Sequence, residues 1–160
     1  MIDQSEDILE LFIARHQKSI FALALYLIGG DRDKAYDITV SSFVKVMRPM
    51  TLLQEKNAFL VQLAKATVAQ CRNTKILPSF SESDFSNLSS GEKESLRIVK
   101  TALQRLPFDI KVPVLLRDQL HFSYPDISLV MDISERNARI QTIQAHSRLR
   151  SQITDIMNHE

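Results

Sequence analysis

Side chains that can recognise DNA bases gather on a predicted helix near the C-terminal end of the sequence. Arg136 and Arg139 lie in its first turns, and Gln144 follows on the same outward side. A guanidinium group can make paired hydrogen bonds to guanine, and a carboxamide can make them to adenine. Ile140 and Ile143 also point outward and can contact the methyl group of thymine. These residue types at helical spacing favour contact with base edges in the major groove.

The elements that would position these side chains have the pattern of a helix-turn-helix. A short helix around residues 125–130 is followed by a turn at residues 131–133, and Ser134 is expected to cap the next helix. In this motif the first turns of the second helix enter the major groove. The opposite side of that helix carries small and apolar residues and is expected to face the core. This inward set comprises Ala138, Thr142, Ala145, Leu149, Ile153 and Ile156.

The same outward side also fits a protein-binding helix. Exposed apolar residues such as Ile140 and Ile143 are typical of protein contacts, and arginines on a solvated helix face are common. The formal net charge of the chain is only +1, and residues 95–160 carry an excess of two basic side chains. DNA-binding domains usually present a more basic surface. We therefore expect weak intrinsic DNA affinity with a shallow salt dependence.

The composition favours an all-α protein that is not an enzyme. The 160 residues include only three glycines, and Cys71 is the single cysteine, which excludes an internal disulfide or a cysteine-based zinc site within one chain. The sequence has no phosphate-binding loop, nucleophile motif or paired metal-ligand spacing, so we expect no catalytic residue, metal or cofactor. No apolar run approaches the ~20 residues of a membrane span, and the acidic N-terminal stretch does not suit a signal peptide. A cytoplasmic protein is expected.

Helical periodicity predicts two small helical domains joined by a flexible linker. The first domain, residues 1–74, holds helices interrupted by a Gly-Gly pair and by Pro49. Residues 75–94 are rich in serine and other polar residues and are predicted to form the linker. The second domain, residues 95–160, contains the helix-turn-helix.

Local signals predict how the helices of the first domain begin and which side they bury. Ser5 is expected to cap the first helix, and Asp31 the second. His16 lies on the apolar side of the first helix and is expected to be a packed residue rather than a ligand. The inward side of the second helix is predicted to comprise Ala35, Ile38, Thr39, Ser42, Phe43 and Val46.

Several stretches together resemble a bacterial RNA polymerase sigma factor of the extracytoplasmic-function type. In the first domain, "DKAYDITVSSFVKVMR" is similar to the clamp-binding helix of that family, and "AFLVQLAKATVAQCR" is similar to its strand-opening helix. In the second, "ALQRLPFDIKVPVLL", "FSYPDISLVMDIS" and "ERNARIQTIQAHSRLR" are similar to its promoter-reading domain. The resemblance covers residues 11–73 and 96–153. It implies two helical domains on a flexible linker.

The resemblance also implies a non-catalytic subunit that binds core RNA polymerase, directs promoter recognition and starts transcription in the bacterial cytoplasm. The residues expected to bind the polymerase clamp are Asp37, Val40, Ser41, Lys45 and Arg48. The residues expected to meet the strand of the minus-ten element are Lys65 and Arg72. The residues expected to read the minus-thirty-five element are Arg136, Asn137, Arg139, Ile140, Ile143 and Gln144.

Departures from the family pattern support an alternative function. Val40 and Ser41 replace a Gln-Glu pair, and Gln141, Gln144 and His146 lie where basic residues are usual. A sigma-like protein that had lost promoter recognition would instead bind an anti-sigma factor or another helical partner through its outward isoleucines and Val40. A free-standing transcription regulator is a weaker third possibility, because the first domain would then have no role.

Overall fold

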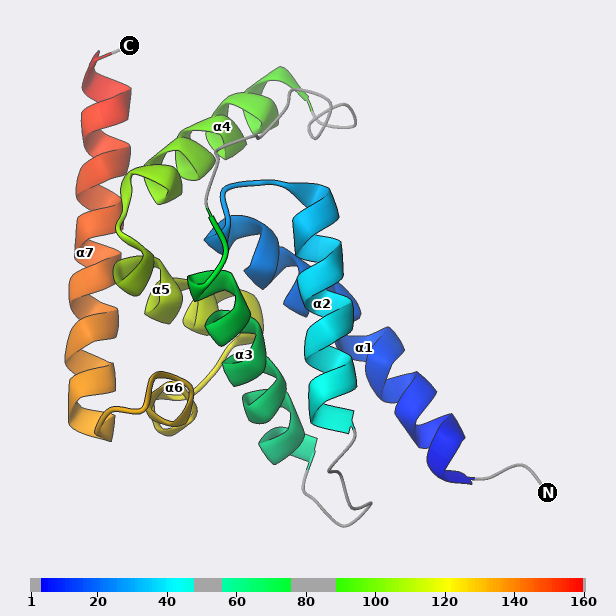
Figure 1. Ribbon diagram of the computed structural model, residues 1–160. Coiled ribbons are helices and arrows are strands. Elements are labelled where there is room, and N and C mark those ends of the chain that lie inside the picture. The colour runs from blue at the N-terminus through cyan, green and yellow to red at the C-terminus, as the bar shows by residue number, and fades with distance from the viewer. Residues whose placement is uncertain (1–3, 48–55, 76–88, 160) are drawn as a thin grey trace.

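The structure is a computed structural model that describes residues 4–47, 56–75 and 89–159. Within these ranges the chain is all-α, as predicted (Figure 1). The helices are α1 (Gln4–Leu27), α2 (Arg32–Met47), α3 (Lys56–Arg72), α4 (Ser90–Arg105), α5 (Phe108–Leu120), α6 (Tyr124–Met131) and α7 (Glu135–His159). Arg48 and most of the predicted linker, residues 76–88, lie outside the described residues.

The predicted stop between the first two helices is confirmed. Gly29 and Gly30 both have positive φ values, which glycine adopts without a steric cost. Asp31 then caps α2, because its carboxylate accepts a hydrogen bond from the Lys34 amide at 3.1 Å. The expectation for Ser5 is wrong: α1 already begins at Gln4, so Ser5 lies inside the helix. The predicted inward side of α2 is buried except for Val46, which is half-buried.

The helix-turn-helix forms through local hydrogen bonds that its sequence supplies. Ser123 and Asp126 cap α6 reciprocally, each side chain accepting from the other's backbone amide. Asp132 ends α6 with a φ of 56°, the left-handed conformation that aspartate tolerates better than most residues. The Ser134 hydroxyl accepts from the Asn137 amide at 3.1 Å, which confirms the predicted cap of α7. The predicted inward side of α7 is buried or half-buried throughout.

α4 begins before the predicted end of the linker, and α5 contains a buried lysine. Ser89 and Glu92 form a capping box that starts α4 at Ser90, so the predicted linker boundary at residue 94 lies inside this helix. Lys111 of α5 is only 4% exposed, and burial lowers the pKa of its ammonium group. The aliphatic part of a lysine can pack like an apolar side chain. α1, α3, α6 and α7 all contact α5, and this packing buries the aliphatic part of Lys111.

The helices of both predicted domains share one core. α1 lies against α5 and α3 lies against α6, while α7 packs along α4, α5 and α6 (Figure 1). Leu23 and Phe59 from the first half join Leu116 and Ile127 from the second half in a continuous apolar cluster. Within the described ranges, no helix has the length and apolar character needed to cross a membrane.

Candidate nucleic-acid interface

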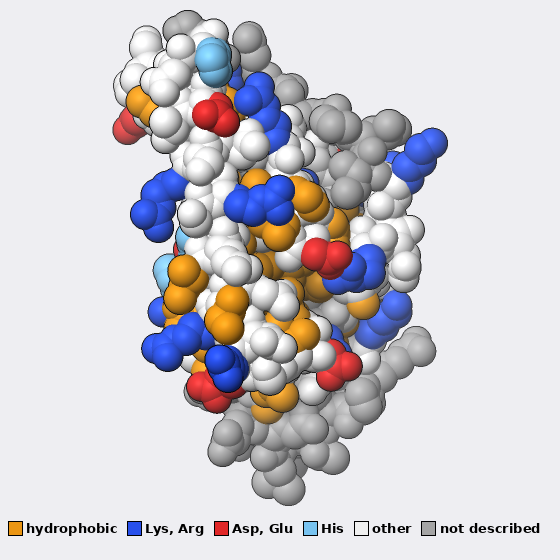
Figure 2. All heavy atoms as spheres, turned by 90° about the vertical axis from the view of Figure 1, so that its left-hand side faces the viewer, with side chains coloured by type: hydrophobic (Ala, Val, Ile, Leu, Met, Phe, Trp, Pro, Cys, Tyr) orange, Lys and Arg blue, Asp and Glu red, His pale blue; other side chains and the backbone are white. Residues whose placement is uncertain are grey.

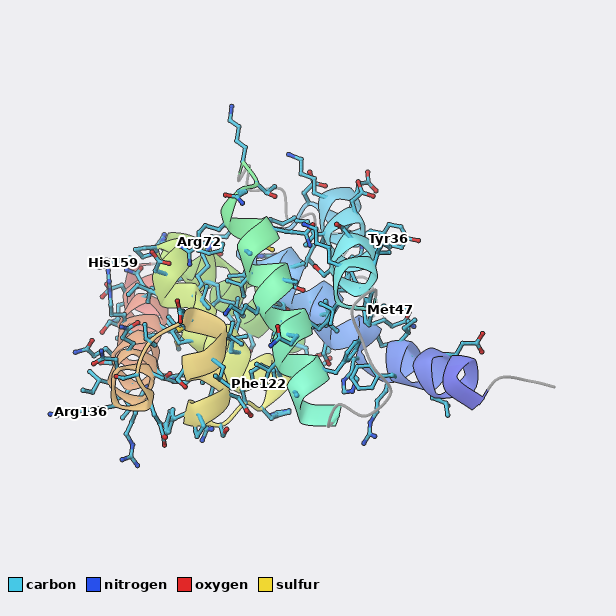
Figure 3. All side chains as sticks on the ribbon, turned by 60° about the horizontal axis from the view of Figure 1, so that its bottom comes forward. Tyr36, Met47, Arg72, Phe122, Arg136 and His159 are labelled. Carbon is cyan, nitrogen blue, oxygen red and sulfur yellow. The ribbon has the colours of Figure 1, made fainter. Side chains whose placement is uncertain are left out.

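The candidate reading residues lie on the exposed side of α7, as the helical spacing predicts. Arg136, Asn137, Arg139, Ile140, Ile143 and Gln144 are all exposed. Figure 3 shows Arg136 at the N-terminal end of α7, pointing away from the bundle. The turn at Asp132 fixes α6 and α7 relative to one another, so the side chains in the first turns of α7 project from a rigid platform. This arrangement is suited to insertion into a groove.

Arg139 of α7 contacts the first residue of α6. Its guanidinium lies 5.6 Å from the centre of the Tyr124 ring, and the guanidinium of Arg117 lies 4.8 Å from the same ring. Arg117 also donates to the carbonyl of Phe122 at 2.7 Å. The two cations and the ring thus connect α5, α6 and α7. The attraction between the guanidinium and the ring face restricts where the Arg139 side chain lies.

Apolar side chains interrupt the basic surface beside these arginines. Leu129 is 59% exposed, Ile140 40% and Ile143 55%. Figure 2 shows the face that α7 contributes to, where hydrophobic side chains lie among Lys and Arg side chains. The mixture can contact thymine methyl groups and phosphates together. It can also receive an amphipathic protein surface.

Lys65 and Arg72 lie on the exposed side of α3, seven residues apart and therefore on the same side of the helix. Lys65 is exposed. Arg72 already has partners: its Nη1 lies 2.6 Å from a carboxylate oxygen of Asp109, and its guanidinium lies 4.9 Å from the centre of the Phe108 ring. Lys65 is thus exposed to solvent, whereas Arg72 contacts the first two residues of α5.

The candidate polymerase-binding residues lie on α2, on the opposite side of the molecule from α7 (Figure 1). Asp37, Val40 and Lys45 are exposed, and Ser41 is half-buried. An open groove of about 470 Å³ lies beside them between α1 and α2. Its lining consists of Ile13, Gln17, Lys18, Phe21, Tyr36, Thr39, Val40, Phe43, Val44 and Met47. The groove is mainly apolar and can take the side chains of a partner helix.

The sequence prediction missed two residues that belong to this surface. Tyr36 is 64% exposed and Val44 is 45% exposed, and each lies one helical turn from Val40. Their spacing of four residues, outside the inward set of α2, was the available signal. Figure 3 shows Tyr36 and Met47 on the α2 side, away from Arg136 of α7.

Gln70 and His146 each form a polar contact between two helices. Gln70 donates from its amide to the Ser42 hydroxyl at 2.7 Å, which links α3 to α2. His146 lies 3.1 Å from a carboxylate oxygen of Asp118, which links α7 to α5. These polar residues therefore hold helices together.

Among the described His, Cys, Asp and Glu residues, no group of three or more could hold a metal ion.

Comparisons with known proteins agree with this geometry. Residues 96–145 match the family described as Sigma-70, region 4, and this range takes in most of α4, all of α5 and α6, and the first part of α7. The chain is also similar to a protein of Haemophilus influenzae named ECF RNA polymerase sigma-E factor. The two are 26% identical over 168 aligned positions, which cover 92% of this chain and 88% of that protein. The second similarity therefore extends well beyond the helix-turn-helix.

Proposed function

We propose that this chain, which belongs to the sigma-70 family of RNA polymerase sigma factors and to its extracytoplasmic-function type, binds polymerase through α2 and reads promoter DNA through α7. A sigma factor directs promoter recognition and transcription initiation without catalysing a reaction itself. Its partners are core RNA polymerase, promoter DNA and anti-sigma factors.

The observation that supports DNA reading most strongly is the exposed first half of α7 on a rigid helix-turn-helix. Arg136 would contact a phosphate or a guanine, and Gln144 would contact an adenine. Each good paired contact to a base discriminates by about 1–3 kcal/mol. The few cations make weak binding by the chain alone expected, and docking on polymerase would supply the rest of the affinity.

The observation that supports polymerase binding is the exposed side of α2 beside the apolar groove. Asp37 and Lys45 provide charges of opposite sign, and Val40 provides an apolar centre between them. An apolar centre with a polar rim is the usual composition of a protein interface. Because polymerase works on the chromosome, a cytoplasmic location is part of this proposal.

Transcription from sheared chromosomal DNA of the source organism tests the function. Core polymerase with the chain should produce transcripts whose start sites share upstream sequence elements, and core polymerase alone should not. An Arg136→Ala/Arg139→Ala variant should lose these start sites, whereas the control Arg97→Ala, which removes an exposed arginine on α4, should retain them. Identical transcripts with and without the folded chain would contradict the proposal.

A second candidate function is binding to an anti-sigma factor without promoter reading. The exposed Ile140 and Ile143 favour it, because an apolar pair in the middle of a DNA-contacting side is also a good protein contact. Capture of core polymerase without any selective start site would support this alternative. Selective start sites that depend on the α7 arginines would exclude it.

A further inference from the structure

His146 joins α7 to α5 at a point where both of its ring nitrogens face acceptor atoms. Nε2 lies 3.1 and 3.2 Å from the two carboxylate oxygens of Asp118, and Nδ1 lies 3.1 Å from the carbonyl oxygen of Thr142. A carboxylate and a carbonyl can only accept, so each nitrogen must carry a hydrogen if both contacts are hydrogen bonds. Only the imidazolium carries both hydrogens. The geometry therefore fits the charged form of this side chain.

The neutral form of the same side chain can satisfy only one of the two acceptors. A neutral imidazole has a single N–H group, and its other nitrogen would turn a lone pair toward an oxygen. Histidine side chains commonly change charge between about pH 5 and 8. Because the bridge needs the bound proton, the bridge and the stability that it contributes are present at the acid end of this range and are lost as the pH rises.

Among the described residues, Asp118 is the only charged partner of His146. The described helices α4 and α6 also pack along α7, but neither contributes an ion pair or a hydrogen bond to this histidine. Arg150, one turn further along α7, is exposed and opposes the charge on His146 only weakly. Beside Asp118 on α5, Arg117 donates to a backbone carbonyl instead, and His121 is exposed at the end of the helix. The carboxylate therefore decides what the proton on His146 does.

The bridge lies close to the proposed DNA-contacting residues. His146 is seven residues, or about two helical turns, beyond Arg139 on α7. Thr142, whose carbonyl faces Nδ1, is buried between them. The bridge therefore fixes the middle of α7 on α5, and the first turns of α7 project from that point. If α7 shifts when the bridge is lost, the fraction of molecules in the DNA-binding arrangement falls, and the apparent affinity falls with it.

We propose that His146 is a positioning residue for DNA binding, whose imidazolium fixes α7 on α5 through Asp118, so that binding weakens as the pH rises. The inference rests on the proposed function, because it assigns a pH dependence to the same α7 surface. The histidine acts through the bridge and not by touching DNA. The effect is modest, because the side chains of His146 and Asp118 are 28% and 51% exposed and water screens their attraction.

Binding of the full chain to a fluorescently labelled random-sequence duplex at pH 6 and pH 8 tests this role. The wild type should bind about two- to fivefold more weakly at pH 8. His146→Arg keeps a cation at both pH values and should bind almost equally at both. His146→Gln is neutral at both and should bind at pH 6 as the wild type does at pH 8. The matched control His159→Gln, at an exposed position of the same helix, should keep the wild-type profile.

Replacement of Asp118 separates positioning from direct contact with DNA. If the charge on His146 acted directly on a phosphate, Asp118→Ala would leave the pH dependence in place. If it acts through the bridge, Asp118→Ala should reduce the pH dependence to that of His146→Gln, and the two changes together should cost no more than either alone. Urea unfolding at pH 6 confirms that each variant is folded before its affinity is compared.

The outcomes distinguish this inference from the proposed function. A pH profile that is the same in the wild type, His146→Arg and His146→Gln, or one that survives Asp118→Ala, would overturn the inference while DNA binding by α7 stands. A folded wild-type chain that binds no duplex at either pH would instead contradict DNA binding by α7, and the inference would fall with it.

Discussion

The guanidinium of Arg139 on α7 lies 5.6 Å from the centre of the Tyr124 ring at the start of α6. This contact connects the two helices of the helix-turn-helix, and the Tyr124 ring also packs against the apolar core. Arg117 of α5 lies over the same ring at 4.8 Å. The Tyr124 ring thus contacts Arg139, which is expected to bind DNA, and Arg117, which also donates a hydrogen bond to the Phe122 carbonyl.

Replacement of Tyr124 should lower stability through these two contacts. Each cation–π contact at an exposed site contributes about 0.5–1 kcal/mol, so Tyr124→Leu should lower the free energy of unfolding by about 1–2 kcal/mol. Tyr124→Phe keeps the ring and should behave like the wild type. Urea denaturation of both variants measures the difference. Equal losses in the two variants would mean that the hydroxyl, not the ring, matters.

The left-handed conformation of Asp132 gives a second prediction. Asp132→Gly should leave the free energy of unfolding within about 1 kcal/mol of the wild type, because glycine adopts a φ of 56° freely but orders a more flexible chain. Asp132→Val should lower it by about 1–2 kcal/mol, because the branched side chain is strained there. The control Asp155→Val makes the same substitution at an exposed helical position of α7. Thermal unfolding that ranks Asp155→Val as equally harmful would contradict the backbone explanation.

Burial of Cys71 should protect its thiol. The side chain is fully buried, and burial raises the pKa of the thiol to about 12. The thiolate is the reactive form, so a thiol reagent at pH 8 should react only as the chain unfolds. Above the thiol's ordinary pKa the unfolded chain ionises and the folded chain does not, so stability should fall as the pH rises from about 8.5 toward 12. Rapid modification of the native chain without urea would contradict the buried placement.

The first turns of α7 should account for most of the salt dependence of DNA binding. If Arg136 contacts a phosphate, Arg136→Ala should reduce the slope of log affinity against log salt by about 0.9 on a random-sequence duplex. Arg97→Ala on α4 should leave the slope unchanged. Fluorescence anisotropy over a range of salt concentrations gives both slopes. Equal slopes in all three proteins would remove Arg136 from the DNA-binding surface.

Local structure was predictable from the sequence because its causes are local. The cap at Ser134, the turn at Asp132 and the inward side of α7 depend on residues within a few positions of one another. The exposure of the candidate DNA-contacting residues followed from the same helical spacing, since a side opposite Ala138 and Thr142 must face outward. Their assignment to particular bases or partners remains a prediction.

The contact between Arg72 and Asp109 was not predictable in the same way. These residues are 37 positions apart, and both are of types that are usually solvated. The pairing follows from how α3 meets α5 in three dimensions. Burial of Lys111 was missed for a related reason, because its charge suggested exposure while the helices around α5 enclose its aliphatic part. The groove between α1 and α2 likewise required both helices to be placed.

The most direct test of the account is the affinity of the labelled chain for core RNA polymerase. The wild type should bind, and Val40→Asp should weaken binding by about tenfold or more, because it places a charge at the centre of the α2 surface. Val99→Asp makes the same change at another exposed valine, on α4, and should leave the affinity unchanged. Failure of the folded wild-type chain to bind active core polymerase at micromolar concentrations would contradict the assignment. Equal binding by wild type and Val40→Asp would show that polymerase docks elsewhere than α2.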